Sequence, residues 1–156
     1  MKSLVVYDST YGNTKLIAEA IAEGIGGETR ALPVSEASSS DLSSVDLLVV
    51  GSPTQGGRAT PAIKAFLGNI PAAALQNTNT AAFDTRISAK DQGIALRTLM
   101  GVIGYAAPRI AKDLQAKGGR MAAAPEGFIV EEKEGPLRRG ESERAAAWAR
   151  GLESGA

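Results

Sequence analysis

The hydroxyl and amide side chains of residues 9–14, the stretch STYGNT, are the strongest candidates for chemistry in this sequence. They lie between a strand-like run ending at Tyr7 and a segment whose apolar residues recur at helical spacing. The first turn of a helix has about four unpaired backbone N–H groups and a partial positive charge of roughly half a unit. The stretch therefore predicts an anion site, most often a phosphate site, built from Ser9, Thr10, Tyr11, Gly12, Asn13 and Thr14. The alternative is an ordinary strand–helix turn in which a serine and an asparagine act only as caps.

The composition leaves few other kinds of chemistry open. The 156 residues include no Cys and no His, so disulfides, the usual zinc and haem ligands, and Ser–His triads are absent. We therefore expect no catalytic side chain and no metal site, and any redox activity must come from a bound cofactor. The net charge is zero and no long basic run is present, which argues against nucleic-acid binding.

No apolar run approaches the roughly 18 residues that a membrane span requires. The first strand is expected to begin after three residues, so we expect no signal peptide and a cytoplasmic location.

Strand-like and helical segments alternate along the chain, and a chain of this length is expected to form a single domain over residues 1–156. Strands are expected at 5–7, 28–32, 45–54, 78–87 and 119–124, with a further short extended piece at 127–132. Helices are expected after the STYGNT stretch, after the Thr60–Pro61 pair, and at 108–119 and 141–152. The alternation predicts a parallel sheet with right-handed crossovers.

Ligands of such open sheets bind beyond the carboxyl ends of the strands, where the strand order reverses. The loops after the first, third and fourth strands are therefore the informative ones. Three phosphate-binding patterns do not fit them. The dinucleotide-binding fingerprint needs three glycines at fixed spacing, and only Gly12 is present. The nucleotide-triphosphatase loop needs a Gly-Lys-Ser/Thr ending, whereas Lys15 follows Asn13 and Thr14. A receiver domain would need an aspartate where Gly51–Ser52–Pro53 ends the third strand.

The loops resemble those of the flavodoxin family. The family's phosphate loop, Ser/Thr-x-Thr-Gly-x-Thr, is matched at Ser9, Gly12 and Thr14, while Tyr11 replaces the usual third hydroxyl residue. GSPTQGG, residues 51–57, is similar to the second flavin loop, and AAFDTR, residues 81–86, stands where the third should be. The resemblance implies a flavodoxin-like three-layer α/β sandwich with a five-stranded parallel sheet in the order 2-1-3-4-5. It also implies noncovalent binding of flavin mononucleotide (FMN).

The resemblance also assigns roles in the second and third loops. It implies that the second loop lines one side of the flavin through Pro53, Thr54, Gln55, Gly56 and Gly57. The Gly56–Gly57 peptide would turn over on reduction, although a simple glycine turn is the alternative. Asp84, Thr85 and Arg86 would supply the third loop, with contacts to the pyrimidine edge.

Two departures from the family pattern affect these roles. Neither loop carries the aromatic residue that flavodoxins commonly stack on the flavin, which leaves Tyr11 as the one well-placed aromatic residue. Arg58 and Arg86 outnumber Asp84, which predicts stabilisation of an anionic reduced flavin.

Three functions compete. The favoured one is an electron carrier, rather than an enzyme, that serves redox partner proteins or small electron acceptors. The alternatives are an FMN-dependent NAD(P)H:quinone-type reductase and a non-redox binding module that retains the fold without flavin. The net charge of zero argues against the carrier hypothesis, because carrier flavodoxins usually present an acidic docking face. The lack of His or Tyr in the second and third loops argues against the reductase hypothesis.

Residues 88–107 form a long connection with an apolar cluster, interrupted by two glycines. The cluster comprises Ile94, Leu96, Leu99, Met100, Val102 and Ile103. It predicts either a helical turn packed on its own domain, a flap over the flavin edge, or a homodimer surface.

Overall fold

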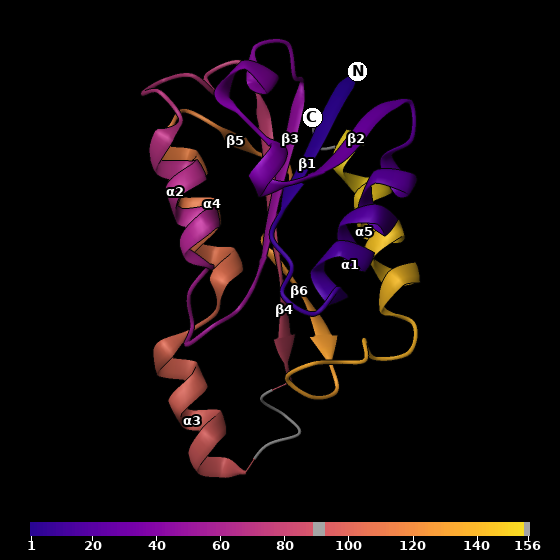
Figure 1. The fold of residues 1–156 in the computed structure, drawn as a ribbon, viewed down its shortest axis with the longest axis vertical. Helices are drawn as coiled ribbons and strands as arrows, with labels where there is room; N and C mark the ends of the chain where they lie inside the picture. The colour runs from indigo at the N-terminus through magenta and orange to yellow at the C-terminus, as the bar shows by residue number, and fades with distance from the viewer. Residues whose placement is uncertain (89–92, 155–156) are drawn as a thin grey trace.

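A parallel sheet forms the centre of the protein, as the computed structural model of residues 1–88 and 93–154 shows (Figure 1). Its strands are β1 (Lys2–Tyr7), β2 (Glu28–Pro33), β3 (Leu47–Pro53), β4 (Asn79–Ile87), β5 (Arg120–Met121) and β6 (Glu126–Val130). They pair in the order β2-β1-β3-β4-β5, and β6 also pairs with β4. The expected order 2-1-3-4-5 is therefore confirmed.

Helices cover both faces of the sheet and complete the expected three layers. α1 (Asn13–Ile25) and α5 (Glu141–Ser154) lie on one face, and α2 (Pro61–Asn69) and α4 (Ala106–Ala116) lie on the other (Figure 1). The serine-rich segment after β2 forms two short 3-10 helices, η1 (Val34–Glu36) and η2 (Ser39–Leu42). No helix in the part of the chain that the structure describes is long and apolar enough to cross a membrane.

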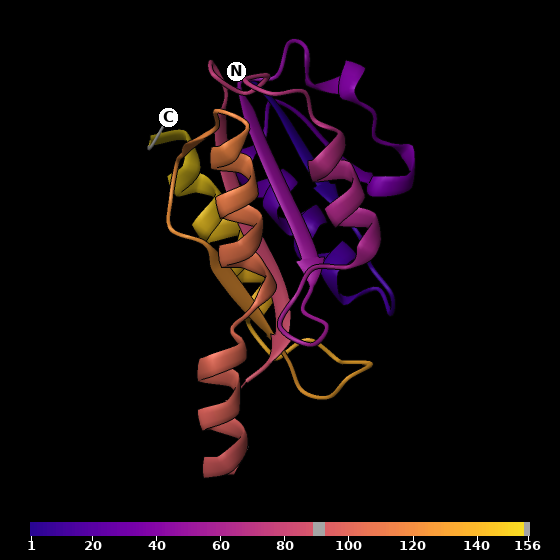
Figure 2. The ribbon, with the colours of Figure 1, turned by 90° about the vertical axis from the view of Figure 1, so that its left-hand side faces the viewer.

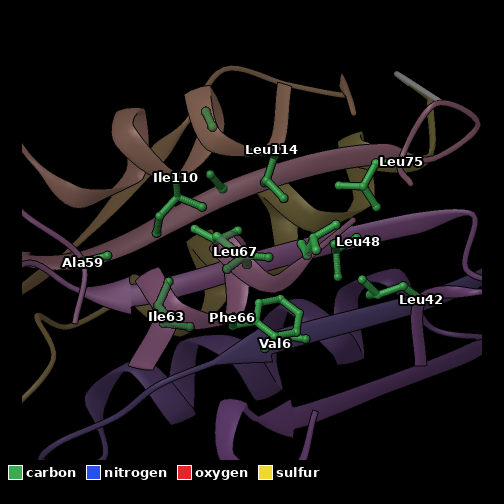
Figure 3. Close-up of a cluster of buried hydrophobic side chains, with 14 of the residues drawn as sticks. Val6, Leu42, Leu48, Ala59, Ile63, Phe66, Leu67, Leu75, Ile110 and Leu114 are labelled. Carbon is green, nitrogen blue, oxygen red and sulfur yellow. The ribbon is translucent and has the colours of Figure 1, made fainter. Parts of the chain in front are cut away.

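Alternate residues of the central strands pack into two separate hydrophobic cores, one on each face of the sheet. Leu48 and Val50 of β3 pack toward α2 and α4, where Ile63, Phe66 and Leu114 meet them (Figure 3). Their neighbours on β3 pack toward α1 and α5 instead. The run Leu47–Ser52 is buried throughout because each face of the strand is covered by a helical layer.

The fifth strand position is divided between two segments, which differs from the expected strand at 119–124. β5 pairs only with Asn79 and Thr80, whereas the longer β6 pairs with residues 83–87 of β4. Pro125 lies between the two segments and has no N–H with which to continue the ladder. The piece expected at 127–132 therefore supplies most of the fifth strand.

Helix α3 (Ile94–Ile103) stands apart from the two helical layers, beyond the carboxyl ends of the strands (Figures 1 and 2). Ile94 and Val102 are each 82% exposed, and Leu99 is 50% exposed. The expectation of a helical turn packed on its own domain is wrong for these side chains. Residues 89–92 of the predicted 88–107 stretch lie outside the described residues.

A buried carboxylate joins α5 to β6. Glu141 accepts hydrogen bonds from the backbone N–H of Ile129 at 2.7 Å and from Arg144 Nε and Nη2 at 2.8 Å. Arg144 also lies over the ring of Phe128, 4.5 Å from its centre. Burial raises the pKa of the Glu141 carboxyl, but the hydrogen bonds from Arg144 and Ile129 outweigh it and leave the pKa below its ordinary value.

We predict that Glu141→Gln lowers the free energy of unfolding by about 1–3 kcal/mol at pH 7. Because the folded-state pKa is lowered, this stabilisation is fully present above the unfolded value of about 4.3 and is lost as pH falls through the folded pKa. Urea denaturation between pH 7 and pH 3 should show the difference between the two proteins shrinking on the acid side. Glu143→Gln, on the exposed side of the same helix, is the control. A pH-independent difference would contradict the assignment.

Candidate functional site

A cleft of about 520 Å³ opens at the carboxyl edge of the sheet, where the loops after β1, β3 and β4 meet. This volume lies within the range of about 300–1,000 Å³ that is usual for small-molecule sites. The cleft is lined by Thr10, Tyr11, Asn13, Thr14, Pro53, Thr54, Gln55, Gly56, Thr85, Arg86, Ile87, Val130 and Lys133. All predicted site residues except Ser9, Gly12, Gly57 and Asp84 are among them.

The loop after β1 presents unpaired backbone donors. Gly12 has φ 94°, a left-handed conformation that favours glycine, and it immediately precedes α1. Ser9 Oγ accepts hydrogen bonds from the N–H groups of Gly12 at 3.0 Å and Lys15 at 3.3 Å, so this side chain braces the loop instead of lining the cleft. Within the described chain, no acceptor meets the N–H groups of residues 10, 11, 13 and 14. An anion at this helix N-terminus would satisfy them.

Two hydrogen bonds join this loop to other walls of the cleft. Thr14 Oγ1 lies 2.8 Å from Thr85 Oγ1, and both threonines are buried. Asn13 Nδ2 donates to the backbone oxygen of Glu134 at 3.1 Å. The first loop is therefore attached both to the end of β4 and to the loop that follows β6.

The second loop is a tight two-residue turn. Gln55 and Arg58 exchange backbone hydrogen bonds of 2.8 and 3.1 Å across Gly56 and Gly57, whose φ angles are 58° and 80°. A Cβ on Gly56 would meet nothing, whereas one on Gly57 would overlap the side chain of Ile103. Gly56 thus lines the cleft, and Gly57 instead packs against the end of α3.

The end of β4 contains a buried ion pair. Asp84 is fully buried, and its carboxylate accepts two hydrogen bonds of 2.7 Å from Arg86 Nε and Nη2. Arg86 lines the cleft, but Asp84 does not. Arg58 is exposed and lies outside the lining. Of the two arginines that the sequence analysis counted against Asp84, Arg86 lines the cleft but is paired with that carboxylate, and Arg58 lies outside the lining.

The cleft also has three lining residues that the sequence analysis missed, namely Ile87, Val130 and Lys133. Ile87 and Val130 end β4 and β6, and Lys133 belongs to the loop after β6. The position of Ile87 and Val130 at the carboxyl ends of strands was the signal that could have found them. Val130 and Lys133 were missed because residues 127–132 were not recognised as part of the fifth strand. Among the described residues, no group of three or more acidic, His or Cys side chains could hold a metal ion.

These features define a flavodoxin-like α/β protein with a cleft at the carboxyl ends of the strands. A model of the flavodoxin domain matches residues 4–125, so the chain belongs to the flavodoxin family. A flavodoxin of Aquifex aeolicus is 42% identical over 44% of this chain and 40% of that protein. An NAD(P)H dehydrogenase (quinone) of Cupriavidus metallidurans is 37% identical over 42% of this chain and 45% of that protein. The chain thus spans less than half the length of these curated relatives.

Solved structures agree on the fold. A flavodoxin from the domain Archaea superposes with a TM-score of 0.75 at 21% identity, covering 99% of this chain and 97% of that one. The rubredoxin oxygen:oxidoreductase of Desulfovibrio gigas gives 0.71 at 23% identity, covering 99% of this chain and 36% of that one. At these identities the likeness shows the fold alone.

We predict that Thr14→Val and Thr85→Val each lower the free energy of unfolding by about 1–3 kcal/mol, because each leaves one buried hydroxyl unpaired. The double variant should lose less than the sum, since it removes both partners. Urea denaturation of the flavin-free protein measures all three, with Thr98→Val on the exposed α3 as control. Strictly additive losses would show that the two loops are not coupled through these hydroxyls.

Proposed function

We propose that the protein binds FMN in this cleft and transfers electrons between redox partners, as a carrier instead of an enzyme acting on its own substrate. The observation that carries the proposal is the set of backbone N–H groups of residues 10, 11, 13 and 14, which meet no acceptor in the described chain, beside a cleft of about 520 Å³. Donors of this kind suit a terminal phosphate, and the remaining space suits an extended, mostly apolar ligand. Membership of the flavodoxin family supports the same assignment.

The phosphate would be held by the first loop. The N–H groups of residues 10, 11, 13 and 14 and the hydroxyl of Thr10 would donate to its oxygens, and the positive end of α1 would favour its charge. Lys133 lines the same cleft and would add a cation. Ser9 and Gly12 would act indirectly, by holding the loop in shape.

The flavin ring would lie between apolar and polar walls. Pro53, Ile87 and Val130 offer apolar surface, and Gln55 and Arg86 offer hydrogen-bond donors. FMN, when bound, supplies the capacity to accept and release one or two electrons. The Gly56–Gly57 peptide would be the one to turn over, because both residues are glycines and a Cβ on Gly56 would meet nothing.

The reductase reading has one observation in its favour, the partial similarity to the Cupriavidus quinone dehydrogenase. Adding a reduced nicotinamide to the flavin-loaded protein separates the two readings. A carrier leaves the flavin oxidised until a partner reductase that passes on the electrons of the nicotinamide is supplied, whereas a reductase bleaches it directly. A protein that takes up no flavin would be the non-redox module.

We predict that the purified protein takes up FMN with quenching of flavin fluorescence and binds riboflavin, which lacks the phosphate, at least tenfold more weakly. Gly12→Ala should strain the phosphate loop by about 1–2 kcal/mol and weaken FMN much more than riboflavin. Gly27→Ala is the matched control, because φ is 59° there and an added Cβ also meets nothing. Gly27 follows α1, at the opposite edge of the sheet from the cleft.

Equal losses of FMN and riboflavin in the Gly12 variant would mean that the loop is only a structural turn. Similar losses of FMN in both glycine variants would show a general effect on stability.

We also propose that α3 mediates self-association, because the side chains of Ile94, Leu99 and Val102 are exposed on it. We predict that Leu99→Asp converts a dimer to a monomer in light scattering without loss of helical circular dichroism. Leu16→Asp is the control, since Leu16 on α1 is similarly exposed, at 52% against 50%. A wild-type protein that is monomeric at high micromolar concentration would overturn the proposal.

A further inference from the structure

The buried ion pair between Asp84 and Arg86 forms one wall of the cleft. The Asp84 side chain is 0% exposed and that of Arg86 is 21% exposed. Two hydrogen bonds of 2.7 Å join them, so both carboxylate oxygens and two of the three guanidinium nitrogens are used. Nη1 of Arg86 has no partner in the described part of the chain. It leaves two N–H donors beside the cleft.

The guanidinium is also held from its flat side. Its Cζ lies 3.6 Å from the centre of the Tyr105 ring. On β6, an added Cβ at Gly127 would overlap the guanidinium, so Arg86 requires a glycine at this neighbour. Stacking, ion pairing and this close approach together fix the orientation of the group.

Asp84 balances more positive charge than Arg86 alone. Its Oδ2 also accepts a hydrogen bond of 2.9 Å from the backbone N–H of Ala107, in the first turn of α4. The adjacent N–H of Ala106 donates to Thr54 Oγ1 at 3.0 Å. The positive end of a helix and a guanidinium therefore face one carboxylate, in a wall from which solvent is largely excluded.

We propose that Asp84 is a positioning residue that neutralises Arg86 and thereby sets the reduction potential of the flavin, an inference that rests on the proposed function. Reduction adds negative charge to a ring lying against this wall. A neutral pair acts on that charge only as a dipole, whereas a single uncompensated charge acts much more strongly at low effective dielectric. Arg86 thus serves mainly as a fixed hydrogen-bond donor, and Asp84 prevents it from acting as a free cation.

The test is a charge cycle measured by spectroelectrochemical titration of the FMN-loaded protein. Asp84→Asn keeps the shape and an acceptor oxygen but leaves Arg86 uncompensated, so the two-electron midpoint potential should rise. Arg86→Gln leaves Asp84 uncompensated, so the potential should fall. Each single change should alter the ratio of affinities for reduced and oxidised FMN by about tenfold, which is about 30 mV for a two-electron couple. The double variant should return close to wild type.

Two controls separate this role from a merely structural one. Arg58→Gln removes a cation that lies outside the lining and should leave the potential unchanged. Arg86→Lys keeps the positive charge but not the bidentate ion pair with Asp84. Its midpoint potential should therefore lie close to that of wild type and above that of Arg86→Gln. Should Asp84→Asn fail to fold, the two Arg86 variants still decide the outcome.

Unchanged potentials in Arg86→Gln, or shifts of the same sign in both single variants, would overturn the inference while FMN binding stands. A wild-type protein that binds no FMN would overturn the proposed function, and this inference with it. FMN titration of each variant before electrochemistry distinguishes the two failures.

Discussion

The cleft depends on the register between β3 and β4. Pro53 lies opposite Thr85, and the Thr54 N–H continues the ladder with a bond of 2.9 Å to the Thr85 oxygen. This register sends Asp84 to the α4 side, where it meets Ala107, and Thr85 to the α1 side, where it meets Thr14. A slip of one residue would exchange the two side chains between faces and break both contacts. The sheet register therefore brings the loops together, and the hydrogen bonds between them depend on that register.

The local sequence pattern was enough to predict a strand that is buried along nearly its whole length. The continuous apolar run at 45–54 predicted β3 because a strand covered on both faces needs no alternation. The division of the fifth strand was missed because Pro125 interrupts a ladder whose partner, β4, is about forty residues earlier in the chain. Lys133 and Val130 were missed for the same reason, since their place at the cleft follows from that pairing.

Charges could be counted from the sequence but not paired. Asp84 and Arg86 are two residues apart on a strand, so their side chains share a face, and this spacing was an available signal. What the spacing could not supply was Tyr105 beneath the guanidinium and Gly127 beside it, both distant in sequence. Because Asp84 is buried and paired with Arg86, the charges of these two residues cancel within the cleft wall, although the sequence offers two arginines for this one carboxylate. The exposed Arg58 remains outside that balance.

The walls of the cleft also determine where affinity for a flavin would arise. Ile87, Val130 and Pro53 bury apolar area, worth about 25 cal/mol per Å², but they lack the further 0.5–1.5 kcal/mol or so of an offset aromatic pair. Tyr11 is 47% exposed and therefore buries only part of its ring. The N–H groups of residues 10, 11, 13 and 14, by contrast, have no acceptor in the described chain and would gain charge-assisted hydrogen bonds to a phosphate. A flavin bound in this cleft would therefore be held more by its phosphate end than by its ring.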